Sequence, residues 1–464
     1  MAAFVGRTNE LETLKREYQR EDAAFVVVYG RRRIGKTATV LRFLEGKRAI
    51  YYLATEQLDS LSIDSFKGVV ATELGDAQLA SARADRWEDA FDAIAGASDP
   101  EERLVVVIDE FQYLGKVNPE FPSILQRLWD ARLRHANIML VLIGSLARII
   151  QQQTLSSGSP LYGCLTAQLH MEQIPFADCQ ELFRTPNDWQ LVERYSITGG
   201  IPKYIEQLPA HRDIYRSIEE SVLDPSGFFY SEPGFLLSRE VVEVGTYFSI
   251  IRAIAAGNQR PGNIANVLGM SQTSLSRYFS VLIDQGIIHR EVPTTEDNPA
   301  KSKRGRYFIA DNLTRFWFRF VLPYMSAIES GHAEAASRAV RAGFVDEHVA
   351  LVYADVCREA LWNLAAEGVV PFKLERVGRW WDDKHAEIDV LGIGEEDALV
   401  GECRFSKEPV GADALHDLEA AAAFVDLGGR RPFYALFSID GFTRELKRLA
   451  SARDDLLLLE GARW

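Results

Sequence analysis

The residues best suited to chemistry lie in one segment, 25–44, which reads FVVVYGRRRIGKTATVLRFL. A short apolar, β-branched run leads into Gly30 and Gly35, and then into Lys36, Thr37 and a helix-period pattern. Glycines let such a turn tighten so that backbone N–H groups face a polyphosphate, and the helix N-terminus adds a favourable dipole. We expect Lys36 to reach the β- and γ-phosphates and Thr37 to ligate Mg²⁺. The segment therefore predicts a loop that binds ATP. Its expected nucleotide contacts are Gly30, Arg31, Arg32, Arg33, Ile34, Gly35, Lys36, Thr37 and Ala38.

A second apolar run, 104–108, ends in the adjacent carboxylates Asp109 and Glu110. Beside a phosphate loop, Asp109 is expected to hold Mg²⁺ and Glu110 to orient the attacking water. The alternative is a strand that happens to end in solvent-exposed acids. One strand later, Ser145 is placed to sense the γ-phosphate, although serine in this position also caps helices. The predicted catalytic residues are Lys36, Glu110 and Ser145.

The elements that must position these residues alternate between strand-like and helix-like segments. Apolar strands are predicted at 25–29, 49–54, 104–108, 138–144 and 169–174. This alternation predicts an α/β fold with a parallel sheet. Pro175 then opens a helical region, which we interpret as a small lid.

The segment 247–311 contains three helix-period stretches followed by two short strands, 287–292 and 307–309. This order predicts a winged helix-turn-helix. Short polar and arginine side chains at the start of its third helix suit contacts with phosphates and base edges. The residues expected to contact DNA are Gln272, Thr273, Arg277 and, in a basic wing, Lys303, Arg304 and Arg306. The alternative is a domain that docks only protein.

The last α/β region places Asp389 and Glu402 on two predicted strands, with Arg404 two residues further on. Two such carboxylates can share one metal ion. The pattern resembles PD-(D/E)xK nucleases, in which a lysine at the position of Arg404 helps to position the water nucleophile. Arginine keeps the positive charge but cannot be deprotonated, so it suits a phosphate better than it serves as a base. The alternative is a relic of the nuclease fold that binds DNA or a partner.

Composition sets the outer limits. With 464 residues and 47% hydrophobic content, the chain is long enough for about three domains. The predicted domains are a P-loop core (1–175), a helical lid (176–240), a winged helix (241–312) and a linker helix with an endonuclease-like domain (313–464). A formal charge of −14 disfavours indiscriminate coating of nucleic acid and requires any DNA contact to be local. The four cysteines have no paired short spacing, and neither a leader nor a membrane span is recognisable, so we expect a cytoplasmic protein.

Four motifs together carry a family resemblance: FVGRTNE at 4–10, the Arg-rich phosphate loop, IDEFQYL at 108–114 and TGGIPKY at 198–204. They resemble the prokaryotic archaeal ATPase family, AAA+-like P-loop proteins related to signal-transducing switch ATPases. The resemblance implies that Val5, Gly6 and Arg7 lie near the adenine and that Pro202 packs on the base. It extends over the chain, because longer members carry a winged helix and an endonuclease-like domain.

One departure from the family pattern concerns the position after Ser159–Gly163, where relatives commonly have an arginine and this chain has Cys164. If that arginine completes a site in relatives, its loss removes charge stabilisation in the transition state. We expect slow turnover, or another arginine such as Arg148 in the role.

These observations favour an ATP-dependent switch that acts on DNA, with ATP and Mg²⁺ as cofactors. An ATP-gated, metal-dependent nuclease in genome defence is the first alternative. A protein-interaction switch without DNA is the second. A homo-oligomer stays open, and no membrane partner is expected.

Overall fold

The computed structural model describes residues 4–81, 86–145, 153–154, 158–183, 185, 187–211, 213–240, 243–382 and 384–464. The chain forms two compact units. One unit comprises Gly6–Ile174 with Ile201–Lys203, and the other comprises Pro175–Gly200 and Tyr204–Trp464 together with the first residues of the chain. We call them the N-terminal unit and the C-terminal unit.

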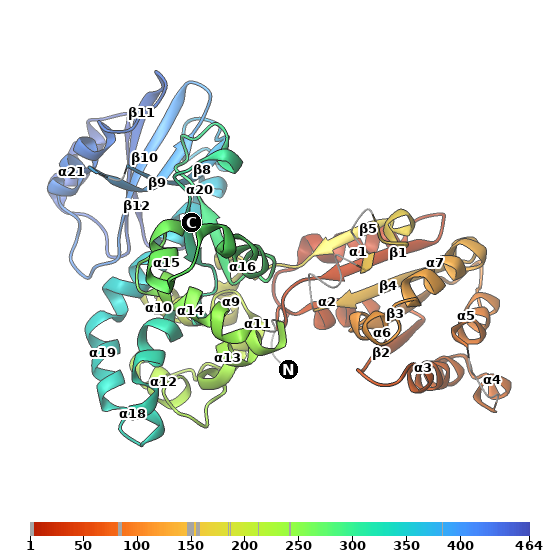
Figure 1. Ribbon diagram of the computed structural model, residues 1–464. Helices are drawn as coiled ribbons and strands as arrows, with labels where there is room; N and C mark the ends of the chain where they lie inside the picture. The colour runs from red at the N-terminus through yellow and green to blue at the C-terminus, as the bar shows by residue number, and fades with distance from the viewer. Residues whose placement is uncertain are drawn as a thin grey trace. The chain divides into compact units, whose positions relative to one another are not determined.

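The N-terminal unit is built on a five-stranded sheet in the order β2-β3-β4-β1-β5 (Figure 1). All of its pairings are parallel, which confirms the predicted α/β class. The strands are β1 (Ala24–Tyr29), β2 (Ala49–Leu53), β3 (Leu104–Asp109), β4 (Ile138–Gly144) and β5 (Ala167–His170). Helices include α1 (Thr8–Tyr18), α2 (Lys36–Leu44), α3 (Asp59–Leu74), α4 (Ala77–Ser81), α5 (Trp87–Gly96), α6 (Gln112–Val117) and α7 (Phe121–Ala131).

The central strands are apolar over nearly all of their length, up to Asp109 at the end of β3, because both faces of the sheet are covered. On one face, alternate residues such as Val27 and Ile108 pack against Phe66, Trp87 and Phe121 from α3, α5 and α7. On the other face, a second set of strand residues packs with Leu14 of α1 and with Val40 and Phe43 of α2. The sheet therefore has a separate hydrophobic core on each face. These two cores hold β1 and α2 in place on either side of the phosphate loop.

The last strand of this sheet differs from its predicted bounds, because β5 ends at His170 rather than continuing to 174. Its partner β1 ends at Tyr29, which pairs with His170. The amide of Met171 still donates to the Tyr29 carbonyl at 2.7 Å, but no further residue of β1 remains to pair with it.

The C-terminal unit begins with helices and continues into three further helices and a two-stranded antiparallel hairpin, the order of elements that the sequence predicts for 247–311. The first helices are α9 (Phe176–Phe183), α10 (Asp188–Thr198), α11 (Pro202–Gln207), α12 (Ile214–Ser221) and α13 (Phe228–Glu240). The next elements are α14 (Val244–Ala255), α15 (Pro261–Leu268), α16 (Gln272–Asp284) and the antiparallel strands β6 (Ile288–Glu291) and β7 (Arg306–Ile309). Leu275, Phe279 and Leu282 of α16 are buried.

Helical segments then connect this part to a mixed sheet (Figure 1). They are α17 (Asn312–Phe316), η5 (Trp317–Val321), η6 (Leu322–Tyr324), α18 (Met325–Glu329), α19 (Glu334–Phe344), η7 (Val345–Val349) and α20 (Ala350–Ala366). The sheet has the order β12-β11-β10-β9-β8. Its elements are β8 (Arg376–Trp381), β9 (Glu387–Ile393), β10 (Asp397–Arg404), α21 (Ala412–Ala422), β11 (Arg431–Ser438), α22 (Arg444–Ser451) and β12 (Leu456–Glu460). Within the described ranges, no helix combines the length and apolarity that a membrane crossing requires.

Candidate nucleotide site

The phosphate loop lies between β1 and α2 and has the backbone that its glycines predict. Gly30 has φ +149° and Gly35 has φ +96°, and a Cβ on Gly30 would stand 2.3 Å from the Met171 carbonyl oxygen. Arg33, between them, also has a positive φ of 69°. The loop therefore requires glycine at position 30 both for conformation and for space.

Lys36 and Thr37 are the first two residues of α2. Lys36 Nζ donates to the carbonyl oxygens of Gly30 and Arg31, both at 2.9 Å, so its ammonium lies across the mouth of the loop. Thr37 Oγ1 donates to Asp109 Oδ2 at 2.6 Å. The tip of β3 and the start of α2 are thereby joined by two oxygen-bearing side chains.

A tyrosine that the sequence analysis did not single out also contacts this carboxylate. Tyr51 of β2 donates its hydroxyl to Asp109 Oδ2 at 2.6 Å. Burial, together with the hydrogen bond to Asp109, raises the pKa of the Tyr51 hydroxyl above its ordinary range, so the hydroxyl stays a donor. Asp109 itself is only 3% exposed.

Glu110 turns away from the strand direction and is held by neighbouring polar groups. Its φ is 55°, an unusual value for a residue with a side chain. Ser145 Oγ donates to Glu110 Oε2 at 2.7 Å, and Gln112 Nε2 donates to the same oxygen. Gln112 Nε2 also contacts Ser145 Oγ at 3.2 Å. The structure thus brings Glu110 and Ser145 together and adds Gln112, which lies two residues along the same motif.

Arg7 fixes the N-terminal motif against the loop. Its guanidinium donates to the carbonyl oxygens of Ile34 at 2.8 Å and of Glu172 at 2.6 Å, and it pairs with Glu10 at 2.8 Å. Gly6 and Arg7 both have positive φ, 69° and 64°. Arg7 is 8% exposed, and its hydrogen bond to the Ile34 carbonyl connects the N-terminal motif to the phosphate loop.

Two further predicted nucleotide contacts, Arg32 and Pro202, have contacts at or near the same loop. Arg32 donates to the Tyr113 hydroxyl at 2.8 Å. Pro202 Cγ lies 3.6 Å from the point that a Cβ on Gly35 would occupy, so Pro202 of the TGGIPKY motif lies beside the loop. Ala38 lies in the first turn of α2, and Val5 directly precedes Gly6 in the chain.

Cys164 lies in the short helix η3 (Tyr162–Cys164) and is buried. Burial raises the pKa of its thiol, so it is a neutral group in the core rather than a cation. Arg148, the predicted substitute for the missing arginine, lies outside the described residues.

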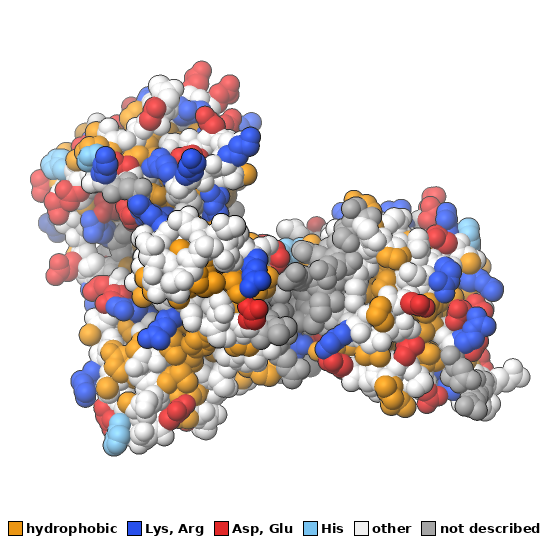
Figure 2. Space-filling view, in the orientation of Figure 1, with side chains coloured by type: hydrophobic (Ala, Val, Ile, Leu, Met, Phe, Trp, Pro, Cys, Tyr) orange, Lys and Arg blue, Asp and Glu red, His pale blue; other side chains and the backbone are white. Residues whose placement is uncertain are grey.

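The predicted DNA contacts fall into two groups. Gln272, Thr273 and Arg277 are exposed on α16, and Arg277 contacts the Tyr278 hydroxyl at 2.5 Å and Glu243 at 3.6 Å. Lys303 is also exposed. Basic and acidic side chains are interspersed over the face in Figure 2, as a net acidic composition requires.

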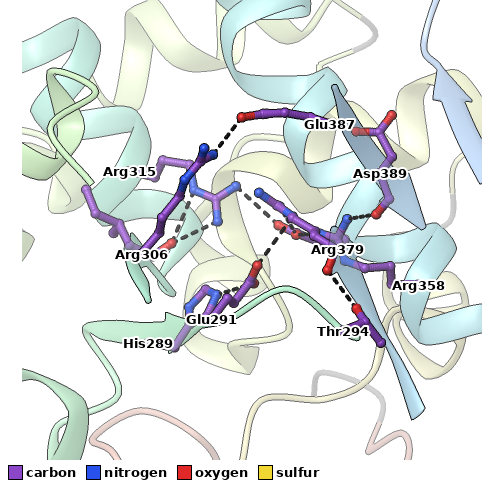
Figure 3. Close-up of polar contacts among 11 residues, drawn as sticks. His289, Glu291, Thr294, Arg306, Arg315, Arg358, Arg379, Glu387 and Asp389 are labelled. Atoms are coloured by element: carbon purple, nitrogen blue, oxygen red, sulfur yellow. Dashed lines mark hydrogen bonds and ion pairs between the residues drawn. The ribbon is translucent and has the colours of Figure 1, made fainter. Parts of the chain in front are cut away.

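The other two predicted DNA contacts, Arg304 and Arg306, contact the C-terminal sheet instead, and Figure 3 shows Arg306 beside Glu387. Arg306 pairs with Glu387 at 2.6 Å and stacks its guanidinium 4.7 Å from the centre of the Trp381 ring. Arg304 donates to the Trp381 carbonyl and lies 3.4 Å from Glu296. In this arrangement both guanidiniums are engaged by protein groups.

In the C-terminal sheet, Asp389 and Glu402 lie on the neighbouring antiparallel strands β9 and β10, beside the paired residues Val390 and Gly401. Asp389 Oδ2 accepts from the Cys403 amide at 3.1 Å, and Glu402 forms an ion pair with Arg404. Burial and the nearby Asp389 raise the pKa of Glu402, against the lowering effect of Arg404. Among the described residues, no group of three or more His, Cys, Asp or Glu side chains is placed to hold a metal ion.

Two protein-family models match segments of this chain. A family described as "ATPase domain predominantly from Archaea" matches residues 4–208, and one described as "Archaea bacterial proteins of unknown function" matches residues 317–416. The uncharacterized protein MJECL04 of Methanocaldococcus jannaschii is 33% identical over 437 residues, which cover 93% of this chain and 95% of that protein. An uncharacterized ATP-binding protein of the same organism, MJ0423, is 47% identical over 45 residues, 10% of this chain and 76% of its own length.

Among solved structures, the Walker-type ATPase PABY2304 of Pyrococcus abyssi has a TM-score of 0.55 at 18% identity, covering 68% of this chain and 96% of that chain. At this identity the likeness establishes the fold. The predicted family is confirmed by the near full-length relative and the ATPase domain match together. This chain belongs to the family of P-loop ATPases found predominantly in Archaea, and it is an ATPase.

Proposed function

We propose that this ATPase hydrolyses Mg²⁺-ATP at the phosphate loop and couples the nucleotide cycle to DNA held by its winged helix. The observation that carries the catalytic half is the hydrogen-bonded set Thr37, Asp109, Glu110 and Ser145 at the ends of α2, β3 and β4. Three elements far apart in the sequence place these side chains beside one loop.

The donor set fits Mg²⁺. A threonine hydroxyl and a buried carboxylate 2.6 Å apart present oxygen ligands, which a hard divalent cation prefers. Thr37 would hold the ion directly and Asp109 would hold it or its water shell. When bound, Mg²⁺ supplies neutralisation of charge on the phosphate oxygens.

The roles of the protein groups follow from their positions. Lys36 and the loop amides would hold the β- and γ-phosphates, and Glu110 would accept a hydrogen bond from the attacking water and orient it. Ser145 and Gln112 keep the Glu110 carboxylate in one position, because both donate to its Oε2. Position 164 holds a buried cysteine where relatives commonly have an arginine. We therefore infer slow basal ATP turnover unless another arginine supplies that positive charge.

The DNA half of the proposal rests on α16. Its N-terminal residues Gln272 and Thr273 and the next-turn Arg277 are exposed side by side, with side-chain chemistry suited to phosphates and base edges. Arg277 is 69% exposed and its pairing with Glu243 is solvated, so a DNA phosphate can replace that partner at little cost.

The test is phosphate release by the full chain with Mg²⁺ and ATP, titrated with duplex DNA at low and moderate salt. Lys36→Ala is the hydrolysis-deficient control, and Arg338→Ala, an exposed arginine on α19, is matched to Arg277→Ala. The proposal is supported if DNA stimulates phosphate release, if the stimulation weakens as salt rises, and if Arg277→Ala reduces it while Arg338→Ala does not. A rate that DNA does not change contradicts the coupling and favours the protein-interaction switch.

A second candidate, metal-dependent DNA cleavage, is favoured by the facing carboxylates of Asp389 and Glu402. The Arg404 guanidinium competes with a metal for Glu402, so this activity is the weaker proposal. Degradation of DNA under Mn²⁺ or Mg²⁺ that Asp389→Ala and Glu402→Ala both abolish would support it. Intact DNA under both ions would exclude it.

A further inference from the structure

The C-terminal unit contains a cavity that none of the predicted sites uses. It has a volume of about 190 Å³ and lies where the end of α14, β7, α17, η5, η7 and β8 meet. An engineered apolar cavity of about 150 Å³ holds a benzene molecule. This cavity therefore has room for a group somewhat larger than one ring.

Three guanidiniums line the cavity, and each comes from a different element. Arg315 of α17 donates to the Ile309 carbonyl at 2.8 Å and to Asp355 at 3.2 Å. Arg379 of β8 donates to Asp355 at 2.7 Å (Figure 3). These anchors hold both guanidiniums in fixed orientations, with 15% and 17% of their side chains exposed.

The buried guanidinium of Arg379 has one N–H donor without a hydrogen-bond partner among the described residues. Its Nε lies 3.6 Å from Glu291, beyond hydrogen-bond distance, and has no hydrogen-bond partner among the described residues. An N–H donor in such surroundings costs free energy unless it finds an acceptor. An anion in the cavity would supply one.

Arg319 of η5 completes the set from the solvent side. It pairs with Glu347, but both side chains are about half exposed, at 50% and 46%. Exposed ion pairs contribute about 0–1 kcal/mol. A ligand of higher charge can therefore displace Glu347, the one acidic residue in the lining.

His348 contributes a different kind of atom. It is 1% exposed, and its Nε2 lies 2.6 Å from the Ser196 carbonyl oxygen, which assigns the proton to Nε2. Burial lowers the pKa of the imidazole to about 3, so the ring is neutral near pH 7. Its Nδ1 is then an acceptor, and it has no hydrogen-bond partner in the described part of the chain.

The rest of the lining is largely apolar and includes Ile254, Phe308 and Leu351. The cavity thus offers guanidinium donors from three elements and an apolar wall, with a neutral His348 in its lining. A carboxylate presents two oxygens in one plane, whereas a terminal phosphate presents three oxygens in different directions, which suits guanidiniums on three separate elements.

We propose that this cavity is a binding site for a small phosphate monoester, of the size of a sugar phosphate, whose phosphate is held by Arg315, Arg319 and Arg379. The cavity lies in the C-terminal unit, whereas the phosphate loop lies in the N-terminal unit, so the two sites are separate. The proposal does not depend on DNA binding.

The test uses the full chain and ribose 5-phosphate, with ribose as the phosphate-free control. Because the phosphate loop also binds phosphates, binding is measured by calorimetry in the unmodified chain and in Lys36→Ala. Arg319→Gln removes the most exposed of the three guanidiniums and so perturbs the fold least. Arg341→Gln is the matched control, since Arg341 is 48% exposed and pairs with Glu219 away from the cavity.

We expect saturable binding of ribose 5-phosphate that persists in Lys36→Ala, that ribose does not reproduce, and that Arg319→Gln weakens about tenfold or more. Arg319→Lys, which keeps the charge, should weaken it less, and Arg341→Gln should leave it unchanged. Binding that disappears in Lys36→Ala would assign the ligand to the phosphate loop and overturn the proposal. Equal affinity in Arg319→Gln and Arg341→Gln, equal binding of ribose, or no saturable binding would overturn it as well.

Discussion

Single residues at the phosphate loop have separable roles in binding and in hydrolysis. Lys36 lies across the loop mouth, held by two backbone carbonyls that also exist in its absence. Lys36→Ala should therefore leave the fold intact while it removes a charge-assisted contact of about 1.5–3 kcal/mol, roughly a 10- to 150-fold loss of ATP affinity. Calorimetric titration with ATP and a circular dichroism spectrum test both parts. Unchanged affinity would contradict the placement of the site.

Glu110 is expected to act on hydrolysis and not on binding. A glutamine in its place is nearly isosteric but neutral, so Glu110→Gln should keep ATP affinity and lower kcat by about 10²- to 10⁴-fold. Ser145→Ala removes one donor to the same carboxylate and should lower kcat by roughly tenfold, because Gln112 still donates to it. Single-turnover phosphate release with saturating ATP measures the effect. If the serine variant lost as much as the glutamine variant, Ser145 would contact the nucleotide itself.

The motif residues of this site could be predicted because their chemistry fixes their spacing. Lys36, Thr37, Asp109 and Glu110 each follow a short apolar strand at a recognisable distance. Tyr51 could not be predicted, since its contact with Asp109 depends on β2 lying beside β3, a fact of strand order that local sequence does not encode. Gln112 lies two residues after Glu110 in the same motif, which is a sign of its role. An amide side chain at that position has many other roles in proteins, so the contact with Glu110 was not predicted.

At the scale of elements, an ion network joins the hairpin β6-β7, α17, α20 and β8. Asp355 of α20 pairs with Arg315, Arg358 and Arg379, and Glu291 of β6 lies 3.6 Å from Arg379 (Figure 3). The wing loop adds the Thr294 hydroxyl, which donates to the Arg379 carbonyl at 2.6 Å. Because these contacts connect the hairpin β6-β7 to α17, α20 and β8, they fix the positions of these elements relative to one another. We call this set of contacts the junction.

The pH dependence of this junction follows from Asp355. Despite the opposing effect of burial, the nearby Arg358, Arg379 and Arg315 lower the pKa of Asp355 below its ordinary value. A lowered carboxylate pKa stabilises the folded state above the unfolded pKa of about 3.9, and this contribution is lost as pH falls through the folded pKa. Acid should therefore loosen the junction progressively below about pH 4.

Asp355→Asn should remove that pH dependence and destabilise the unit by about 2–3 kcal/mol at pH 7, because three partly buried guanidiniums lose their charged partner. The measurement is pulsed hydrogen exchange of α20 and β8 peptides after equilibration in urea at pH 7 and pH 3. Asp440→Asn, at an exposed loop residue, is the control. Parallel losses of stability in the unmodified chain and in Asp355→Asn would contradict the assignment.

The order of helices and strands along the chain could be predicted from the sequence, whereas the contacts between these elements were harder to predict. The five parallel strands of the core follow from apolar runs, but the end of β5 is set by the length of β1 rather than by its own sequence. The basic wing at 301–306 indicated nucleic acid, whereas Arg304 and Arg306 contact Trp381 and Glu387. Those partners lie about 80 residues further along the chain, so the pattern of charges alone could not identify them.

At the scale of the whole molecule, a net charge of −14 opposes binding to any polyanion. If the chain nevertheless binds DNA, a few exposed cations must supply the attraction, and α16 offers Arg277 while the hairpin offers Lys303. The wing arginines can join them only by giving up their contacts with Trp381 and Glu387. DNA affinity should consequently be modest and strongly dependent on few residues.

This argument makes a quantitative prediction for salt. Each phosphate neutralised by a side chain contributes close to −0.9 to the slope of log K against log salt, so Arg277→Ala should reduce the slope by about one and weaken binding on any sequence. Arg338→Ala should change neither quantity, because α19 carries no predicted DNA contact. Fluorescence anisotropy of a labelled duplex at several salt concentrations, with and without ATP, measures both. A slope that is the same for the two variants would remove α16 from the DNA interface, and with it the DNA half of the proposed function, while leaving the nucleotide site unaffected.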